Sequence, residues 1–311
     1  MQNSPTENHP SEEADSGSDM LHTFLAAGDT VRGAVLDATR MVRQMRQAHE
    51  LGILEALVLG HAYMGVCLMS AGLKGRDRLQ LTLDCSGPIK GLVAEANADG
   101  DVRGFLKQVP IPVEAPVMDA NLSSFFGAGF LSVTRTLEEA RQPFTGRVML
   151  AHGNLAQDLA HYYLTSEQIP TSFSLSVKFD RQGAVDAAGG LFLQAMPDAD
   201  DTVIGQLADR VTDLPSIGMA LVRGESPSGF VRRHLEDFSP RFIDRRPVAF
   251  NCHCNREQIY NLLRMMPLEE LRDIQAKGPF PVSIRCHHCN MRYAFDRDAI
   301  DRIVAARFAD N

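Results

Sequence analysis

The sequence of 311 residues predicts an α+β protein built on a mainly antiparallel sheet, and three observations support this fold class. Segments in which apolar and polar residues alternate, which is typical of half-buried strands, occur in pairs joined by turn sequences. A few segments with helical spacing interrupt these pairs, a mixture that favours α+β architecture. Hydrophobic residues make up 44% and charged residues 23% of the chain, so one or two domains can form a core without disulfides.

The first segment, residues 1–18, is expected to be a disordered acidic tail. It is polar, with two prolines, four serines and no aromatic residue, so it cannot bury enough apolar surface to offset the entropy of ordering. Residues 1–19 carry −5 of the net charge of −8, which leaves the body nearly neutral and makes nucleic acid an unlikely partner. Because no secretory signal is visible at this end, a cytoplasmic location is expected.

Residues 19–197 are predicted to form the α+β core domain. Residues 79–85 and 173–179 alternate between apolar and polar side chains, which predicts two half-buried strands. Asp99-Gly100 predicts a hairpin turn, and Gly189-Gly190 predicts a bulge or a close-packing point in a further strand.

The sequence also predicts helices in this core. Asn154 is a candidate N-cap for a helix whose apolar face includes Leu159 and Tyr162, and residues 31–68 contain further helical sequence. Residues 56–73 run for 18 positions without a formal charge, long enough for a membrane span. Because this stretch contains His61 and no second span follows, we expect a buried core helix and no contact with a membrane.

Residues 198–249 are predicted to form a charged, helical and metastable linker. Nine acidic and seven basic residues fall among the 49 positions from 198 to 246, and four prolines interrupt residues 198–249. Apolar residues at 203, 204, 207 and 211 keep helical spacing, as do those at 230, 231 and 235. The pattern predicts short amphipathic helices with weak caps, which can dock onto another surface but are marginal alone.

Residues 250–311 are predicted to form a small C-terminal domain. Asn255 followed by Gln258 resembles a capping box at the start of one helix, and Pro267 can begin a second helix that Gly278 ends. Val282 and Ile284 predict a short strand leading to Cys286, and Asp296 is a candidate cap for a final helix.

Four of the six cysteines lie in this last domain, as Cys252-x-Cys254 and Cys286-x-x-Cys289. Two close pairs of thiols on two turns supply the tetrahedral sulfur ligands that zinc prefers, so we predict one zinc ion held by four thiolates. A histidine of the same turns (His253, His287 or His288) is an alternative ligand. The other two cysteines, Cys67 and Cys85, lie in apolar surroundings and are expected to be small buried side chains.

Such a site can be a structural clip or a redox switch. Zinc keeps thiols as thiolates, the form that oxidants attack, and oxidation of the ligands would eject the metal. A small domain that depends on zinc should unfold when it is lost. Four thiolates leave no open position for a catalytic water, and we find neither a P-loop nor a dinucleotide fingerprint, so no enzyme is expected. A zinc-ribbon protein that binds nucleic acid or regulates is the alternative function, because several arginines lie in the C-terminal domain.

Beyond the cysteines, a series of short motifs runs in order along the chain. They are Val31-Arg32-Gly33; Gly87-Pro88-Ile89; Val93-Ala94-Glu95-Ala96; Gly100-Asp101-Val102-Arg103-Gly104; Gly127-x-Gly129 with Val133-Thr134-Arg135; Thr145-Gly146-x-Val148; Asp158 with Tyr163; Ser166-Glu167-Gln168-x-Pro170; and Ala188-Gly189-Gly190 with Gln194-x-Met196-Pro197. With the cysteine pairs, this series resembles the bacterial redox-regulated chaperone family called heat-shock protein thirty-three. The resemblance covers nearly the whole chain from Asp19 onward.

The resemblance implies a function as well as a fold. Members of that family have an α+β core, a metastable helical linker and a zinc-binding C-terminal domain, and their reduced, zinc-bound form is inactive. Oxidation forms two local disulfides, releases zinc and unfolds the linker, which yields an ATP-independent holdase that binds unfolding proteins under oxidative stress. The oxidised protein can form a homodimer.

Carried onto this chain, the resemblance implies zinc ligands at Cys252, Cys254, Cys286 and Cys289. It implies disulfides Cys252–Cys254 and Cys286–Cys289. The acidic tail and the histidines inside the cysteine turns are not part of the family's pattern, so their roles remain open.

Overall fold

The computed structural model describes residues 18–113 and 122–309, so the predicted tail before Ser18 lies outside the described residues. The described strands are β1 (Asp19–Ala26), β2 (Val31–Asp37), β3 (Arg78–Cys85), β4 (Gly91–Asn97), β5 (Asp101–Leu106), β6 (Gly129–Thr136), β7 (Phe144–Met149), β8 (Thr171–Phe179), β9 (Val185–Ala195), β10 (Arg241–Phe250), β11 (Val282–Arg285) and β12 (Arg292–Phe295). The described helices are α1 (Thr39–His49), α2 (Ile53–Met69), α3 (Ser123–Phe126), α4 (Leu155–Tyr162), α5 (Asp201–Asp213), α6 (Ile217–Val222), α7 (Pro227–His234), α8 (Arg256–Arg264), α9 (Leu268–Lys277) and α10 (Arg297–Ala309).

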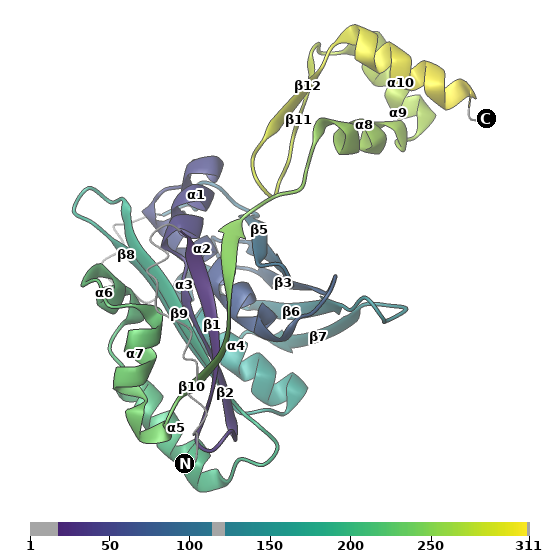
Figure 1. The fold of residues 1–311 in the computed structure, drawn as a ribbon. Coiled ribbons are helices and arrows are strands. Elements are labelled where there is room, and N and C mark those ends of the chain that lie inside the picture. Colours follow the sequence, from purple (N-terminus) through teal and green to yellow (C-terminus); the bar gives the residue numbers. More distant parts are fainter. Residues whose placement is uncertain (1–17, 114–121, 310–311) are drawn as a thin grey trace, which may run out of the picture.

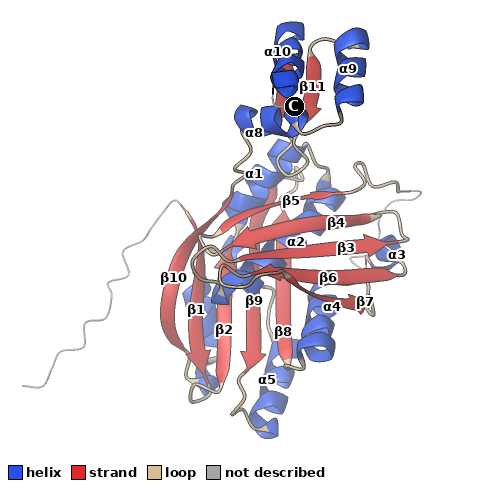
Figure 2. Cartoon of the chain, turned by 90° about the vertical axis from the view of Figure 1, so that its right-hand side faces the viewer, coloured by secondary structure: helices blue, strands red, loops and turns tan. Residues whose placement is uncertain are grey.

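The main sheet has the strand order β7-β6-β3-β4-β5-β10-β1-β2-β9-β8. All neighbouring strands are antiparallel except β5 and β10, which join in parallel through only Ala249↔Asp101 and Phe250↔Val102. Figure 2 shows the β3–β7 half running across the half that contains β10, β1, β2, β9 and β8. The predicted α+β class with a mainly antiparallel sheet is confirmed, as are the strands at 79–85 and 173–179 and the turn at Asp99-Gly100.

Helix α2 is the central helix of the core. It packs against β4, β5, β8 and β9, and the hydroxyl of its Tyr63 donates a hydrogen bond to the carbonyl of Gly104 at 3.0 Å. The helix is long and apolar enough to cross a membrane, but 78% of its most apolar window is buried inside the fold, as expected for a core helix. The helical sequence predicted within residues 31–68 is confirmed as α1 and α2, and residues 31–37 at its start form strand β2 between β1 and β9.

Helices α5, α6 and α7 form a layer on the half-sheet of β2 and β9. Leu207, Ile217 and Phe230 from these helices pack with Val35, Leu193 and other residues of the strands in a second apolar cluster. The helices predicted between residues 198 and 246 are therefore confirmed. The prediction of weak caps was wrong: Asp200, Ser216 and Ser226 each accept a hydrogen bond from the backbone N–H three residues ahead, as N-caps do.

Strand β10 contradicts the predicted end of the helical linker. Residues 241–249 were assigned to that linker and Phe250 to the C-terminal domain, yet residues 241–250 form a ten-residue strand between β1 and β5. The strand carries Pro247 and four charged residues, and only Val248 is fully buried, so no apolar alternation reveals it. Its register depends on β1, more than 200 residues away in the chain, which no local pattern encodes.

The C-terminal elements lie beyond the end of β10 (Figure 1). Helices α8, α9 and α10 and the β11–β12 hairpin enclose a third, small apolar cluster centred on Leu271, Phe295, Ile300 and Ile303. The predicted caps Asn255 and Asp296 are confirmed, since their side chains accept hydrogen bonds from the N–H groups of Gln258 and Ala299 at 2.8 Å. The domain boundaries at residues 197, 249 and 250 stay predictions.

Candidate metal centre

Two turns bring the four C-terminal cysteines together. Cys252 and Cys254 follow directly after strand β10, and Cys286 and Cys289 lie in the turn that joins β11 to β12. In that second turn the N–H of Cys286 donates to the carbonyl of Met291 and the N–H of Asn290 donates to the carbonyl of Cys286. Asn290 adopts a left-handed conformation (φ 63°), which asparagine tolerates better than most residues. The turn holds its two sulfur atoms within 4.8 Å of each other.

The geometry of the four sulfurs fits a tetrahedral metal ion. All four Sγ atoms lie within 4.8 Å of one another. The Sγ atoms of Cys252 and Cys286 are 3.8 Å apart, and those of Cys254 and Cys289 are 3.3 Å apart. Four sulfurs at about 2.3 Å from one centre lie about 3.8 Å from each other. The residues could hold one ion, and all-thiolate ligation suits zinc.

Hydrogen bonds modify the acidity of this cluster. Burial alone would raise the pKa of the Cys254 thiol, but hydrogen bonds from the Tyr293 hydroxyl and the neighbouring thiols outweigh it and lower that pKa. The Tyr293 oxygen lies 3.1 Å from the Cys254 sulfur. Burial raises the pKa of Cys286 and of Cys289. The surroundings of Cys254 thus favour the thiolate, the form that binds metal, more than the surroundings of Cys286 and Cys289 do.

Tyr293 is a residue that the sequence analysis did not single out. It lies on β12, two residues before Phe295, where its ring packs against the C-terminal apolar cluster and its hydroxyl reaches the first cysteine turn. Its position four residues after Cys289 is no recognised ligand spacing, so only the hairpin reveals its contact with Cys254.

The remaining predicted residues lie outside the sulfur cluster. The histidines of the two turns (His253, His287 and His288) are not in the group of possible metal ligands, which consists of four cysteines. Cys67 is fully buried, and burial raises its pKa to about 12, as expected for a core side chain. Cys85, predicted to be buried, is only partly so, because it ends strand β3 at the sheet margin.

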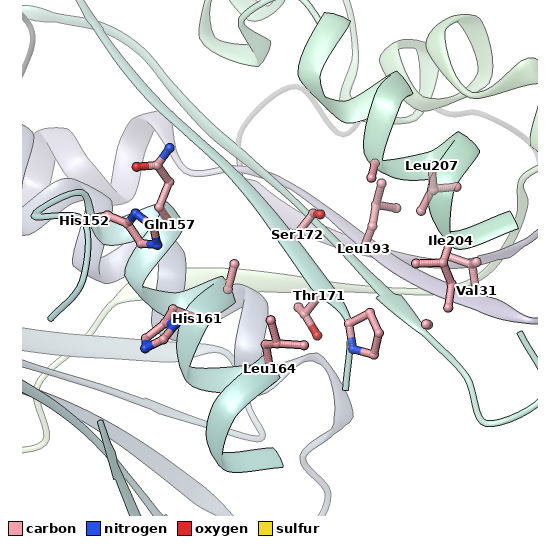
Figure 3. A pocket seen from close by; sticks show the side chains of 14 residues that line it. Val31, His152, Gln157, His161, Leu164, Thr171, Ser172, Leu193, Ile204 and Leu207 are labelled. Carbon is pink, nitrogen blue, oxygen red and sulfur yellow. The ribbon is translucent and has the colours of Figure 1, made fainter. Parts of the chain in front are cut away.

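A pocket of about 410 Å³ lies elsewhere in the molecule, between α4, β8, β9 and α5 (Figure 3). Its lining is mostly apolar and includes Leu164, Leu193, Ile204 and Leu207. The imidazoles of His152 and His161 stand near each other at its edge, with ring centroids 6.0 Å apart. The pocket is a hollow between the core and the first of the three helices that cover the sheet.

Comparison with known proteins assigns the fold and the cysteine cluster to one family. The family model described as Hsp33 protein matches residues 19–296. The chain is 34% identical over 288 residues to the 33 kDa chaperonin of Desulforamulus reducens, covering 92% of this chain and 97% of that protein. It is also 34% identical over 278 residues to the 33 kDa chaperonin of Syntrophotalea carbinolica, covering 89% and 96%. The crystal structure of the 33 kDa chaperonin (heat shock protein 33 homolog) from Thermotoga maritima superposes with a TM-score of 0.85 at 28% identity, covering 94% of this chain and all of that one.

Proposed function

The chain belongs to the Hsp33 family of chaperones, and on that premise we propose that it is a redox-regulated holdase that works without ATP. In this proposal the reduced, zinc-bound protein is inactive, and oxidation of the cysteine turns activates it to bind unfolding proteins under oxidative stress. The observation that carries the proposal is the single cluster of four thiols built from two turns on either side of helices α8 and α9.

Cys252, Cys254, Cys286 and Cys289 are the proposed zinc ligands. A bound zinc ion would keep the four thiols deprotonated and would tie the two turns to each other. The small apolar cluster of the C-terminal domain has eight buried residues within the described part of the chain, so the domain depends on this tie more than the core does.

Each turn supplies both thiolates of one proposed disulfide, Cys252–Cys254 in the first and Cys286–Cys289 in the second. One thiolate of a pair attacks a peroxide oxygen, which breaks the O–O bond, releases hydroxide and leaves a sulfenic acid. The second thiolate then attacks that sulfur and displaces a second hydroxide. With two protons taken up, each disulfide converts one hydrogen peroxide into two waters, and the turns no longer offer thiolate ligands.

Loss of the C-terminal fold is then expected to free helices α5–α7, which lead into β10. These helices cover an apolar strip of the sheet that includes Val35, Leu191 and Leu193. Short helices are marginal without a surface to pack on, so their release would expose apolar residues of both the sheet and the helices. Unfolded proteins expose apolar segments that such a surface can bind. A homodimer on oxidation and a cytoplasmic location belong to the same proposal.

The test is a light-scattering assay of a heat-unfolded client protein, with released zinc measured in parallel by a chelating dye. Zinc-loaded reduced protein should leave aggregation unchanged, and peroxide-treated protein should suppress it as zinc appears in solution. The Cys85→Ser variant is the matched control, because Cys85 lies outside the cluster and should leave the switch intact. Equal suppression by the reduced and oxidised proteins would refute the redox switch.

A further inference from the structure

The histidines of the cysteine turns contact the core domain. His253 lies between the two cysteines of the first turn, and His287 and His288 lie between those of the second. None of them belongs to the group of possible metal ligands. Each instead has a ring or backbone contact with α1 or β5 of the core.

In the first turn, the contacts converge on the start of β5. The His253 Nε2–H donates to the Asp101 carboxylate at 2.8 Å. The Asn251 side-chain amide donates to the other oxygen of the same carboxylate at 3.1 Å, and the Asn251 backbone N–H donates to the Val102 carbonyl at 3.0 Å. Both residues that flank Cys252 are therefore held by the first two residues of β5.

In the second turn, the contacts reach the ends of α1 and β5. His49, which is buried, donates from Nε2 to the backbone carbonyl of His288 at 3.1 Å. The Asn290 side-chain amide donates to the Ala48 carbonyl at 2.8 Å. The rings of His287 and His288 lie against Phe105, with centroids 5.4 and 5.3 Å away. We call the full set of these contacts the docking contact. On the side of the cysteine turns it comprises Asn251, His253, His287, His288 and Asn290, and on the side of the core it comprises Ala48, His49, Asp101, Val102 and Phe105.

We propose that the histidines of the cysteine turns are docking residues, and that the docking contact makes the core a stabiliser of the reduced form of both turns. The bond from His49 ends on a backbone carbonyl inside Cys286-x-x-Cys289, so it depends on the path of the main chain between the two thiols. His253 projects from the single residue that separates Cys252 and Cys254, and closing a disulfide across that residue must reorient it.

The consequence follows from thermodynamic reciprocity. If docking favours the reduced turns, then reduction of the turns favours docking to the same extent, and any change that weakens docking must make oxidation easier. The docking contact also involves β5 beside its short parallel pairing with β10, the strand that follows α5–α7. The core thus has a direct contact with the redox site in addition to the chain connection. The redox half of this inference rests on the proposed function, whereas the docking half does not.

The experiment uses the full-length, zinc-loaded protein in glutathione buffers of graded ratio. In each turn two thiolates lose two electrons and join as a disulfide, while one glutathione disulfide gains two electrons and becomes two thiolates. Replacing His49 and His253 together by phenylalanine keeps an aromatic ring at each position and removes two hydrogen bonds. The glutathione ratio at half-oxidation should move about tenfold toward reducing conditions, as expected for two bonds of ordinary net strength. Amide exchange of residues 252–254 and 286–290 in the reduced protein should become faster.

Two variants make the result specific. Replacing the same two histidines by glutamine restores an N–H donor at a similar reach and should recover most of the shift. His152→Phe, at the pocket of Figure 3, is the matched control and should behave like the unmodified protein. The reduced form of every variant should hold one zinc ion per chain, and a loss of zinc from a reduced variant would overturn the inference in favour of histidine ligation. Unchanged exchange would refute docking, and unchanged half-oxidation would refute its redox role. The aggregation assay on the unmodified protein tests the proposed function separately.

Discussion

The core and the C-terminal domain keep their folds by different means. The core buries an extensive apolar cluster around helix α2, whereas the C-terminal cluster has eight buried residues among those whose side chains the structure describes. Burial of apolar surface scales with domain size, so small domains need a further constraint such as a metal or disulfides. The four-thiol cluster is placed to provide that constraint. The comparison predicts that the core fold persists when the four sulfurs change their chemical state, whereas the C-terminal fold does not.

Among substitutions that separate the stability of the C-terminal domain from that of the core, Cys254→Ser is expected to have the largest effect. Structural zinc contributes on the order of 10 kcal/mol to the folding of small domains, and a serine hydroxyl is a poor replacement for the thiolate. The variant should retain zinc weakly and lose redox control, and amides of residues 256–309 should lose exchange protection while those of α2 keep theirs. Cys85→Ser is the control and should retain zinc. A Cys254→Ser protein that stays inactive when reduced and activates normally when oxidised would contradict the role of Cys254.

The converse change weakens the core and leaves the metal site intact. Leu59 on α2 is fully buried, and truncating such a leucine to alanine costs about 2–5 kcal/mol through lost burial and a residual cavity. Leu59→Ala should lower the urea midpoint of the core without changing zinc affinity, measured by competition with a chelator. Ile53→Ala, at an exposed position of the same helix, should have little effect on either quantity. A loss of zinc affinity in Leu59→Ala would mean that the two folds are not separable.

Acid should destabilise the core through His61. Burial, with a smaller contribution from the positive charge of Lys178, lowers the pKa of His61 to about 4. The unfolded chain takes up this proton near pH 6.5 and the folded chain only near pH 4, so stability is lost as the pH falls between those values. Between pH 7 and 5 the loss should be about 2 kcal/mol, and His61→Leu should abolish it.

This prediction is checked by measuring the free energy of unfolding of the core at several pH values through hydrogen exchange of the α2 amides. Asp19 acts in the opposite direction, because burial raises its pKa to about 6 and the folded state therefore binds the proton more readily than the unfolded state. The His61 contribution must accordingly be taken as the difference between the unmodified protein and His61→Leu. Identical pH profiles for the two proteins would contradict it.

The sequence predicted the elements whose determinants are local. Alternation marked β3 and β8, side-chain caps marked α4, α8 and α10, and the paired spacing marked the four thiols that the structure brings together. Strand β10 was not predicted because its pairing with β1 and β5 is long-range and its side chains are mostly exposed. Tyr293 and the docking contact were not predicted for a related reason. Each depends on where the C-terminal hairpin lies in space, and the spacing of residues along the sequence does not specify that position.

The smallest effect is expected from removing equivalent helix caps, one in the core and one in the C-terminal domain. Asn154 caps α4 in the core and Asn255 caps α8 in the C-terminal domain, and each accepts a hydrogen bond from the N–H three residues ahead. Replacing either by alanine should cost about 1 kcal/mol. In the core this cost is spread over a large cooperative fold and should leave zinc exchange unchanged. In the C-terminal domain the same cost should raise the open population, and with it the rate of zinc transfer to a chelator, about fivefold. Equal transfer rates for Asn154→Ala and Asn255→Ala would show that the metal site does not sense the stability of its own small domain.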